Sequence, residues 1–533
     1  MRPTPRPGDR AHLARQSLMS RSLDDPMAGT IPPELPFARH RAWYAALSLS
    51  LVVGALFRGW DLGLLSFWYD EVVTMRLARA PSPGALLDLL SRIDATRAPL
   101  HPLLLQGWLR IFGDGEAAGR SLSAACGVAT IGLVGLIGRR AFDGPTGLLA
   151  AWFAAISPPL VAYSREARMY ALLVLLTTAC WWLLFEQAEG AWLIPRGRRK
   201  VARAGYAIGL AAMVYAHPLG MLMAATLGLG SLMFARALFG SPRSWLLVHL
   251  AGLAPALPWI PRYFDHPPEF LTGPLPIRSL LGTPIGFLGG NFVVLGAILA
   301  LIAAGLWRRR DSPFVGGLGA GRWAWPACLG LWLVVPPLLL YGYSRLRNPV
   351  FGPSRYTLFV APAYLVLVAQ GLAVLPRVPR IAAALCVWFL VRPALLPLLL
   401  DPTLKADWRG FAATVAERLD ERPAGRITVV VTSADPSRNV EVETARYYLP
   451  PACRVLAFEG DTPEIRRVGD GGETFLTVGV KGDASGPPPP DPPGGRWVPA
   501  RDFPGLRVYR LEPDRPGDRP PAPAGRGPGA SGR

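Results

Sequence analysis

Residues 42–71 of this chain, AWYAALSLSLVVGALFRGWDLGLLSFWYDE, place two adjacent carboxylates shortly after an apolar run of membrane length. The run covers residues 42–58, and an aromatic cluster precedes Asp70 and Glu71. Charged side chains at the edge of hydrocarbon are costly unless they are solvated, paired or used, and aromatic residues gather at the same depth. The acidic pair is therefore a candidate functional site.

The composition of the whole chain is that of a polytopic membrane protein. Of its 533 residues 51% are hydrophobic, and the mean hydropathy is +0.28, which is too apolar for an ordinary soluble protein of this length. The formal net charge of +19 would also suit a nucleic-acid-binding protein. The basic residues stand in short clusters between apolar runs, however, which is the pattern of membrane loops and disfavours nucleic acid as a partner.

Apolar runs long enough to cross hydrocarbon occur about eleven times, at roughly twenty residues for each crossing. They lie at residues 42–58, 120–138, 145–163, 168–186, 204–217, 218–235, 244–261, 283–306, 323–343, 357–375 and 381–400. Arginine clusters stand at every second boundary between these runs, and such clusters mark cytoplasmic loops. We therefore expect a multi-pass protein with a cytoplasmic N-terminus.

The segments outside the runs divide the chain further. Residues 1–40 are polar and lack the apolar core of a signal peptide, so we expect a disordered cytoplasmic N-terminus before an uncleaved anchor. Residues 41–400 form the predicted transmembrane domain, whose first outer loop, residues 59–119, is too long for a plain connection. Helical spacing of apolar residues predicts interfacial helices in this loop. They cover residues 70–80, 83–94 and 99–112.

The character of the sequence changes after Asp401. Strand-like runs and one amphipathic stretch predict a small extracytoplasmic α/β domain over residues 401–513. The strands are expected at 427–434, 453–460, 473–480 and 505–512, the helix at 407–420, and a loop at 486–495. Pro, Gly and Arg dominate residues 514–533, where we expect disorder.

Asp70 and Glu71 cannot both face one substrate, because neighbours on a helix point about 100° apart. Asp70 is the stronger candidate for a catalytic base, since it would open a helix over 71–80 with its side chain free in the cleft. The structural alternative is that Asp70 only caps that helix, with Glu71 favourably placed near its positive end. The sequence leaves both interpretations open.

The turn at 163–170, YSREARMY, lies on the expected outer face and carries a second cluster. Arg165 and Arg168 are three residues apart and could share one helix face, with Glu166 available to hold one of them. Paired guanidiniums suit a phosphate or diphosphate group, because each planar fork donates two hydrogen bonds. A self-neutralising salt bridge is the alternative.

Further candidates lie elsewhere on the outer face. Arg355 stands where an outer loop meets a helix and could reach a lipid phosphate. We take four further polar residues as supporting the site: His101, Tyr163, His217 and Tyr356. Both histidines stand beside a proline, where a lone histidine is more often a hydrogen-bonded structural residue than a metal ligand. The six histidines have no metal-ligand spacing, the five cysteines include no C-x-x-C motif, and no acidic cluster suggests a hard-cation site. We therefore expect neither a metal nor another cofactor.

Taken in order, several stretches resemble the bacterial glycosyltransferase family 39-like proteins, relatives of protein O-mannosyltransferases and of aminoarabinose transferases. The likeness covers most of residues 42–420. The matching stretches are WYDEVVTMRLA (68–78), HPLLLQGWLRIFG (101–113), RSLSAACGVATIGLVGLIGRRAFDG (120–144), AISPPLVAYSREARMYALLVLL (155–176), VYAHPLGMLM (214–223), SRYTLFVAPAYLVL (354–367) and KADWRGFAATV (405–415).

The resemblance implies a mainly α-helical GT-C membrane bundle with its site at the outer surface of a bacterial-type plasma membrane. It implies transfer of a sugar from a polyprenyl-phosphate donor to a lipid, glycan or protein acceptor, with inversion at the anomeric carbon. Membrane lipids are the remaining expected partners. Carried over by motif, the catalytic acid/base residue is Asp70 with Glu71 beside it, and the residues near the donor phosphate are Arg165, Glu166, Arg168 and Arg355.

Two other classes of function are alternatives. A transporter or lipid flippase would explain the many spans, but it predicts internal repeats and broken or charged helices near mid-membrane. No repeat is evident, and the charged residues gather at one surface. The third hypothesis is a protein with an idle motif whose outer domain binds a partner or glycan; the acidic pair argues against it.

Overall fold

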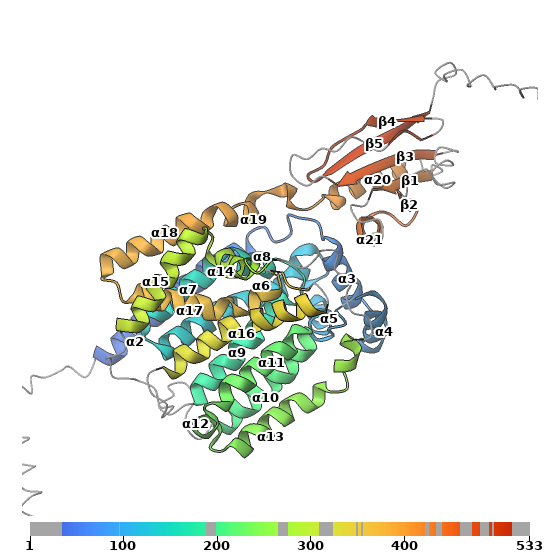
Figure 1. Cartoon of the computed structure of the whole chain (residues 1–533). Helices are drawn as coiled ribbons and strands as arrows, with labels where there is room; N and C mark the ends of the chain where they lie inside the picture. Colours follow the sequence, from blue (N-terminus) through green and yellow to red (C-terminus); the bar gives the residue numbers. More distant parts are fainter. Residues whose placement is uncertain are drawn as a thin grey trace, which may run out of the picture. The chain divides into compact units, whose positions relative to one another are not determined.

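The computed structural model describes most of the chain between residues 35 and 513 (Figure 1). The described ranges are 35–94, 96–187, 199–264, 276–308, 323–347, 350–352, 355–421, 426–432, 440–458, 472–479, 490–492 and 495–513. Met1–Ser48 forms one compact unit, and Leu49–Arg533, which holds every candidate site residue, forms another. The disorder expected for residues 1–34 and 514–533 lies outside the described residues, as does most of the expected loop at 486–495.

Helices make up the described part before residue 401. In chain order they are α2 (Leu35–Gly59), α3 (Tyr69–Ala78), α4 (Pro83–Ile93), α5 (Leu100–Phe112), α6 (Glu116–Ala141), α7 (Gly144–Ile156), α8 (Pro158–Ser164), α9 (Tyr170–Gln187), α10 (Arg199–Ala216), α11 (Leu219–Leu232), α12 (Ala235–Phe239), α13 (Pro242–Leu253), η2 (Ala254–Ala256), η3 (Ile260–Tyr263), α14 (Ser279–Leu288), α15 (Phe292–Arg308), α16 (Ala324–Leu346), η5 (Arg355–Val360), α17 (Ala361–Ala373), α18 (Arg377–Leu395) and α19 (Pro397–Leu400).

The helix α2 begins earlier than expected, inside the segment 1–40 for which the sequence predicts disorder. Its proline, Pro36, stands in the first turn, where the missing N–H has no intrahelical partner to lose. Helix formation can therefore extend back to Leu35.

The expected number of eleven spans is not confirmed. Among the described residues six helices are long and apolar enough to cross a membrane, or up to eight if each of two bent helix pairs is one span. The pair α7 and α8 bends by 57° at Ser157, and the pair α14 and α15 bends by 78° near Gly289. The runs expected at 204–217, 218–235 and 244–261 do form helices, but these are too short or too polar to meet the same criterion.

The centre of the helical bundle is built around α6, α7, α9 and α17, which pack closely against one another. The α6–α7 crossing depends on glycine. A Cβ atom at Gly147 would lie 2.5 Å from the carbonyl oxygen of Gly135, and one at Gly138 would lie 3.0 Å from the Cα of Gly147. Small residues let helix backbones approach this closely, which is how helices associate where lipid removes the hydrophobic driving force.

The three helices predicted in the first outer loop are confirmed as α3, α4 and α5. Leu86 and Leu90 of α4 pack against Val73 and Leu77 of α3, and α5 places Leu105 against the other side of α3. The loop is therefore a small helical layer with its own core, which fixes α3 and the acidic pair at its start.

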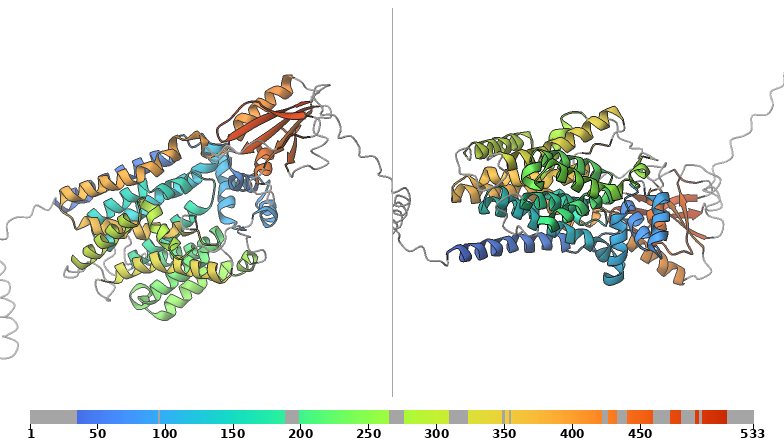
Figure 2. Two further views of the ribbon diagram at one scale, coloured as in Figure 1. Left: turned by 45° about the horizontal axis from the view of Figure 1, so that its top comes forward. Right: turned by 90° about the horizontal axis from the view of Figure 1, so that it is seen from below.

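The segment after α19 folds into the predicted α/β domain. It contains η6 (Pro402–Leu404), α20 (Trp408–Glu421), β1 (Arg426–Val431), α21 (Val440–Tyr448), β2 (Arg454–Ala457), β3 (Gly472–Gly479), β4 (Gly495–Pro499) and β5 (Leu506–Pro513). The strand order is β2-β1-β3-β5-β4, with β1 parallel to β2 and β3, and with β5 antiparallel to both of its neighbours. The strands form a single sheet in both views of Figure 2.

Two elements of this domain were absent from the expectation. The strand β4 is short and ends in Pro499, and α21 has a mixed polar sequence with weak periodicity. Both are stabilised by tertiary packing. Val442 and Ala445 of α21 join α20 on one face of the sheet, whereas Trp497 of β4 packs on the opposite face.

Replacing Gly147 by leucine should destabilise the bundle. The new side chain would overlap the α6 backbone, and overpacking typically costs about 1–3 kcal/mol. Thermal unfolding in detergent should show a lower midpoint for Gly147→Leu. Gly107→Leu on α5 is the matched control, because nothing lies within 4 Å of its Cβ position and leucine is the better helix former. Equal midpoints for the two variants would contradict the proposed role of the close crossing.

Candidate active site

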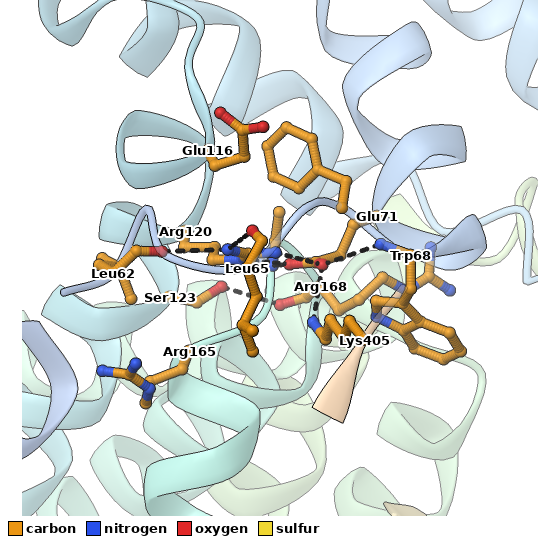
Figure 3. Close-up of polar contacts among 12 residues, drawn as sticks. Leu62, Leu65, Trp68, Glu71, Glu116, Arg120, Ser123, Arg165, Arg168 and Lys405 are labelled. Atoms are coloured by element: carbon orange, nitrogen blue, oxygen red, sulfur yellow. Dashed lines mark hydrogen bonds and ion pairs between the residues drawn. The ribbon is translucent and has the colours of Figure 1, made fainter. Parts of the chain in front are cut away.

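Glu71 is completely buried, and both of its carboxylate oxygens are occupied (Figure 3). Arg120 donates from Nε to Oε1 and from Nη2 to Oε2, each at 2.8 Å. The Lys405 Nζ donates to Oε2 at 2.8 Å, and the backbone N–H of Ala167 donates to Oε1 at 2.9 Å. Glu71 therefore joins four segments that are far apart in the sequence.

Arg120 uses every N–H of its guanidinium in this network. Besides the two bonds to Glu71, it donates to the carbonyl oxygens of Leu62, Leu65 and Ser66 at 3.0, 2.7 and 3.0 Å. A guanidinium has five donors, and all five have acceptors here. The chain that leads into the acidic motif is thereby held against α6.

The local sequence explains how Glu71 reaches this position. The helix α3 begins at Tyr69, so Trp68 is the N-cap residue, and Glu71 at the third helical position accepts a hydrogen bond from the Trp68 backbone N–H at 3.4 Å. This is one half of a capping box. The alternative that Asp70 caps the helix is wrong, because Asp70 lies inside the first turn.

The charge state of Glu71 follows from its two cationic partners. Burial alone would raise the pKa of this carboxyl, but the charges of Arg120 and Lys405 and their hydrogen bonds outweigh burial and lower the pKa from 4.5 to about 2. Glu71 is ionised at neutral pH and has no free position for a substrate proton. Its role in the structure is to organise the motif.

Asp70 is the open member of the acidic pair. Its carboxylate is 23% exposed, and Oδ2 lies 3.6 Å from Nη1 of Arg355. The backbone of Asp70 is fixed, because its carbonyl oxygen accepts hydrogen bonds from Arg168 Nη1 at 3.1 Å and from Thr74 Oγ1 at 3.0 Å. A fixed backbone with a partly exposed carboxylate beside a cation is the geometry of a group that can act on a bound molecule.

Arg165 and Arg168 do not share a helix face, so this expectation is wrong. They lie in the non-helical turn between α8 and α9 and diverge. Arg165 donates to the carbonyl oxygens of Phe57 and Trp60 at the end of α2 and points away from Glu71 (Figure 3). Arg168 instead turns to Asp70 and Thr74. Three-residue spacing brings side chains together only on a continuous helix.

Arg168 and Arg355 are the cations next to Asp70. Arg168 is buried, its pKa is raised because the attraction of Asp70 and Asp94 outweighs burial, and its Nε has no hydrogen-bond partner among the described residues. The Arg355 guanidinium lies 5.2 Å from the ring centre of Trp68 and 5.7 Å from that of Tyr170. Aromatic faces orient a guanidinium without neutralising its charge.

Glu166 does not hold an arginine in place, which corrects a second expectation. Within the described residues it forms no ion pair with Arg165 or Arg168, and its Oε2 is enclosed without a hydrogen-bond partner. Burial raises the pKa of its carboxyl; the negative charges of Glu71 and Asp70 act in the same direction, whereas the positive charges of Lys405 and Arg355 oppose it. Glu166 therefore faces the same group of charges as the acidic pair.

The supporting residues gather around the two cations. The ring of His217 lies 5.8 Å from that of Tyr170 and 6.4 Å from that of Tyr356, and Tyr163 packs edge-on against Tyr170 at 5.3 Å.

Both candidate histidines are buried and neutral. His217 accepts from the Leu219 N–H at Nδ1, so its proton is on Nε2, which has no partner among the described residues. His101 also has an unpartnered Nε2. Burial, followed by the charge of Arg168, lowers the pKa of each imidazole to about 3. In the described part of the chain no group of three or more His, Cys, Asp or Glu side chains could hold a metal ion.

Sequence reasoning missed Arg120 and Lys405, the two partners of Glu71. Arg120 begins an apolar run, where an arginine is usually a boundary charge. Lys405 had a signal that could have drawn attention, since lysine occurs in this arginine-rich chain only at positions 200, 405 and 481. Trp68 and Tyr170 were also missed as site residues, because aromatic residues are common at membrane interfaces.

The fold is similar to that of known membrane glycosyltransferases. ArnT from Cupriavidus metallidurans bound to undecaprenyl phosphate aligns with a TM-score of 0.52 at 14% identity, over 88% of this chain and 97% of that chain. Its apo state aligns with a TM-score of 0.54 at 13% identity, over 89% and 98%. An oligosaccharyltransferase from Archaeoglobus fulgidus aligns with a TM-score of 0.48 at 12% identity, over 82% and 69%. At these identities the similarity concerns the fold.

The sequence gives a second, independent result. Residues 96–261 match the family described as dolichyl-phosphate-mannose-protein mannosyltransferase. No curated protein matches the chain in a sequence search. The family match covers only residues 96–261, and the shared fold is that of GT-C membrane proteins; both agree with the class that the sequence predicts.

Replacing Glu71 by glutamine should destabilise the protein strongly. Breaking a buried pair leaves its partners uncompensated, at a cost of about 3–5 kcal/mol. Glu443→Gln is the control, because Glu443 pairs with Arg76 at a partly exposed position, where a pair contributes about 1 kcal/mol or less. In thermal unfolding at neutral pH, Glu71→Gln should have a clearly lower midpoint than Glu443→Gln. Equal midpoints would contradict the assigned role of Glu71.

The same network has a pH dependence. Because the folded pKa of Glu71 lies below its ordinary value, its contribution is complete above pH 4.5 and is lost as the pH falls towards about 2. The unfolding midpoints of the native protein and of Glu71→Gln should therefore converge below pH 4.5. A constant gap down to pH 2 would contradict the assigned ionisation.

Proposed function

We propose that the protein transfers a sugar from a polyprenyl-phosphate carrier to an extracytoplasmic acceptor, with Asp70 as the general base. The observation that carries the proposal is the position of the Asp70 carboxylate. It is partly exposed and lies beside Arg355, while Arg168 holds the Asp70 backbone carbonyl, on a fold shared with glycosyltransferases. One carboxylate beside two guanidiniums is what a reaction with an incoming hydroxyl and a departing phosphate requires.

The reaction follows from these groups. The acceptor oxygen forms a bond to the anomeric carbon of the sugar while the bond from that carbon to the phosphate oxygen breaks. The acceptor proton passes to the Asp70 carboxylate, and the phosphate departs with the bonding electrons as polyprenyl phosphate. Attack opposite to the leaving group inverts the anomeric centre.

The charge distribution supports an anionic leaving group. Four cations face the site: Arg120, Lys405, Arg168 and Arg355. The carboxylates of Asp70 and Glu71 offset two of these charges, and the raised pKa of Glu166 limits its own contribution. The excess positive charge stabilises a phosphate that gains charge as the glycosidic bond breaks, because donors fixed in place need no reorganisation.

Two unpartnered donors add to this arrangement. The Nε of Arg168 and the protonated Nε2 of His217 are enclosed and have no acceptor in the described structure. A buried donor without a partner is costly, typically about 1–3 kcal/mol. Oxygens of a bound donor phosphate or sugar would satisfy both groups.

The orientation in the membrane belongs to the same proposal. The N-terminus lies in the cytoplasm, and the site and the C-terminal domain lie outside a bacterial-type plasma membrane, as the arginine clusters between spans indicate. A lipid-linked donor suits this side, because it can cross the bilayer, whereas nucleotide sugars remain in the cytoplasm. Arg165 binds the end of α2 and has no part in the proposed donor site.

Asp70→Asn should abolish most transfer without loss of folding. Removing a general base typically costs about 10²–10⁴-fold in rate, and asparagine keeps the shape of the side chain. Radiolabelled sugar transfer from polyprenyl-phosphate sugar to membrane acceptors, with the purified protein in proteoliposomes, measures the loss. Asp88→Asn on α4 is exposed in the same loop and serves as control. Equal activity of the two variants would rule out Asp70 as the base.

Arg355→Gln should weaken both donor binding and turnover. The side chain touches Asp70 and would face the phosphate, so its loss removes attraction in the ground state and in the transition state. We expect kcat/KM for the donor to fall roughly 10²-fold, on the scale of a lost transition-state donor. Arg345→Gln, at an exposed arginine at the end of α16, is the matched control. Unchanged donor kinetics in Arg355→Gln would place the phosphate elsewhere.

A further inference from the structure

The segment that follows the last membrane helix reaches back into the acidic motif. Lys405 lies between η6 and α20, yet its Nζ is 2.8 Å from Oε2 of Glu71 and 5.9 Å from the ring centre of Trp68. The side chain is only 17% exposed. A lysine loses hydration and side-chain freedom in such a position. The contacts that Lys405 makes must offset this cost.

Tyr448 at the end of α21 contacts the start of the same motif. Its hydroxyl accepts a hydrogen bond from the Phe67 backbone N–H at 2.6 Å and donates one to Glu116 Oε1 at 3.0 Å. The helix α21 packs against α3, and Arg76 of α3 forms an ion pair with Glu443 of α21. The C-terminal domain therefore contacts the motif through a second, independent element.

We propose that Lys405 and Tyr448 are positioning residues. They hold residues 67–71 from the side of the C-terminal domain and so fix the orientation of the Asp70 carboxylate. The inference rests on the proposed transfer reaction and makes the α/β domain a part of its catalytic unit. It also distinguishes this domain from a separate module that binds a partner or glycan.

The two contacts act on opposite ends of one short segment. Tyr448 fixes the backbone N–H that enters the motif, and Lys405 fixes the carboxylate one residue after Asp70. Arg120 holds the same carboxylate from the bundle. Among the described residues the approach of Arg355 is the one ion pair that the Asp70 carboxylate makes, so the direction of this carboxylate depends on how firmly both flanks are held.

Lys405→Met and Tyr448→Phe test this in the full-length protein. Each removes the polar contact and keeps most of the side-chain volume. We expect kcat to fall roughly tenfold to a hundredfold, since a misplacement of about 1 Å can cost about 10²-fold, with donor KM changed less than kcat. Lys405→Arg keeps the charge and should restore part of the activity.

The pH profile of activity gives a second readout, which reports whether the Lys405–Glu71 ion pair is coupled to turnover. The charged groups facing Glu71 are Arg120 from α6, Lys405 from the segment before α20, and Glu166 from the turn after α8. Loss of Lys405 removes one of the two cations that keep Glu71 ionised, so the pKa of Glu71 should rise. When the pH is lowered, Lys405→Met should therefore lose activity at a higher pH than the native enzyme does. Lys405→Arg should keep the native profile.

Arg409→Gln is the matched control. Arg409 anchors the same segment to the carbonyl oxygens of Gly63 and Leu64 and to the Glu116 carboxylate, all of them outside residues 67–71. If Lys405 only anchors the domain, the Arg409 and Lys405 variants should lose kcat equally, and that result would overturn the proposal.

Hydrogen exchange makes the test independent of catalysis. Amides of residues 67–71 should exchange faster in Lys405→Met and Tyr448→Phe than in the native protein and in Arg409→Gln. If the native protein transfers sugar, and Lys405→Met and Tyr448→Phe change neither kcat nor the exchange of residues 67–71, the positioning role is refuted while the proposed function stands. Absence of transfer by the native protein, with faster exchange in both variants, would instead count against the proposed function and leave the positioning role standing.

Discussion

The structure of the site depends on the buried carboxylate of Glu71. This single group accepts hydrogen bonds from α6, from the turn after α8, from the segment before α20 and from its own helix start. A buried ion pair is weak evidence for stability by itself, because desolvation offsets much of the attraction. Its contribution here is to fix how these four segments meet, since one carboxylate accepts hydrogen bonds from all of them.

Glu71 and Asp70, the two members of the acidic pair, have different roles. Glu71 is saturated and keeps its charge, whereas Asp70 has a fixed backbone and an open carboxylate. Helical geometry requires the separation, because adjacent side chains diverge by about 100°. The aromatic rings of Trp68 and Tyr170 lie against the Arg355 guanidinium and orient it beside Asp70. In the proposed reaction this leaves one base with two cations beside it, Arg355 and Arg168.

The limits of sequence reasoning show in the arginines. Arg168 was predicted to face the site and does so, but Arg165, three residues away, turns to the end of α2 because the turn between them is not helical. Arg120 was counted as part of an apolar run and holds the motif with all five of its donors. Spacing along the chain predicts neighbours only within a regular helix, and the turn at 165–168 is not one.

By itself, the sequence was enough to determine the apolar helices of membrane length, the helices between residues 59 and 119, the mixed domain after residue 401 and the acidic motif. These depend on local periodicity and on the distribution of charge, both of which can be read along the chain. Only the tertiary structure decided that Glu71 organises the motif while Asp70 stays open, and that Lys405 and Tyr448 reach the motif from the C-terminal domain. Those facts depend on contacts between residues hundreds of positions apart, for which local pattern carries no information.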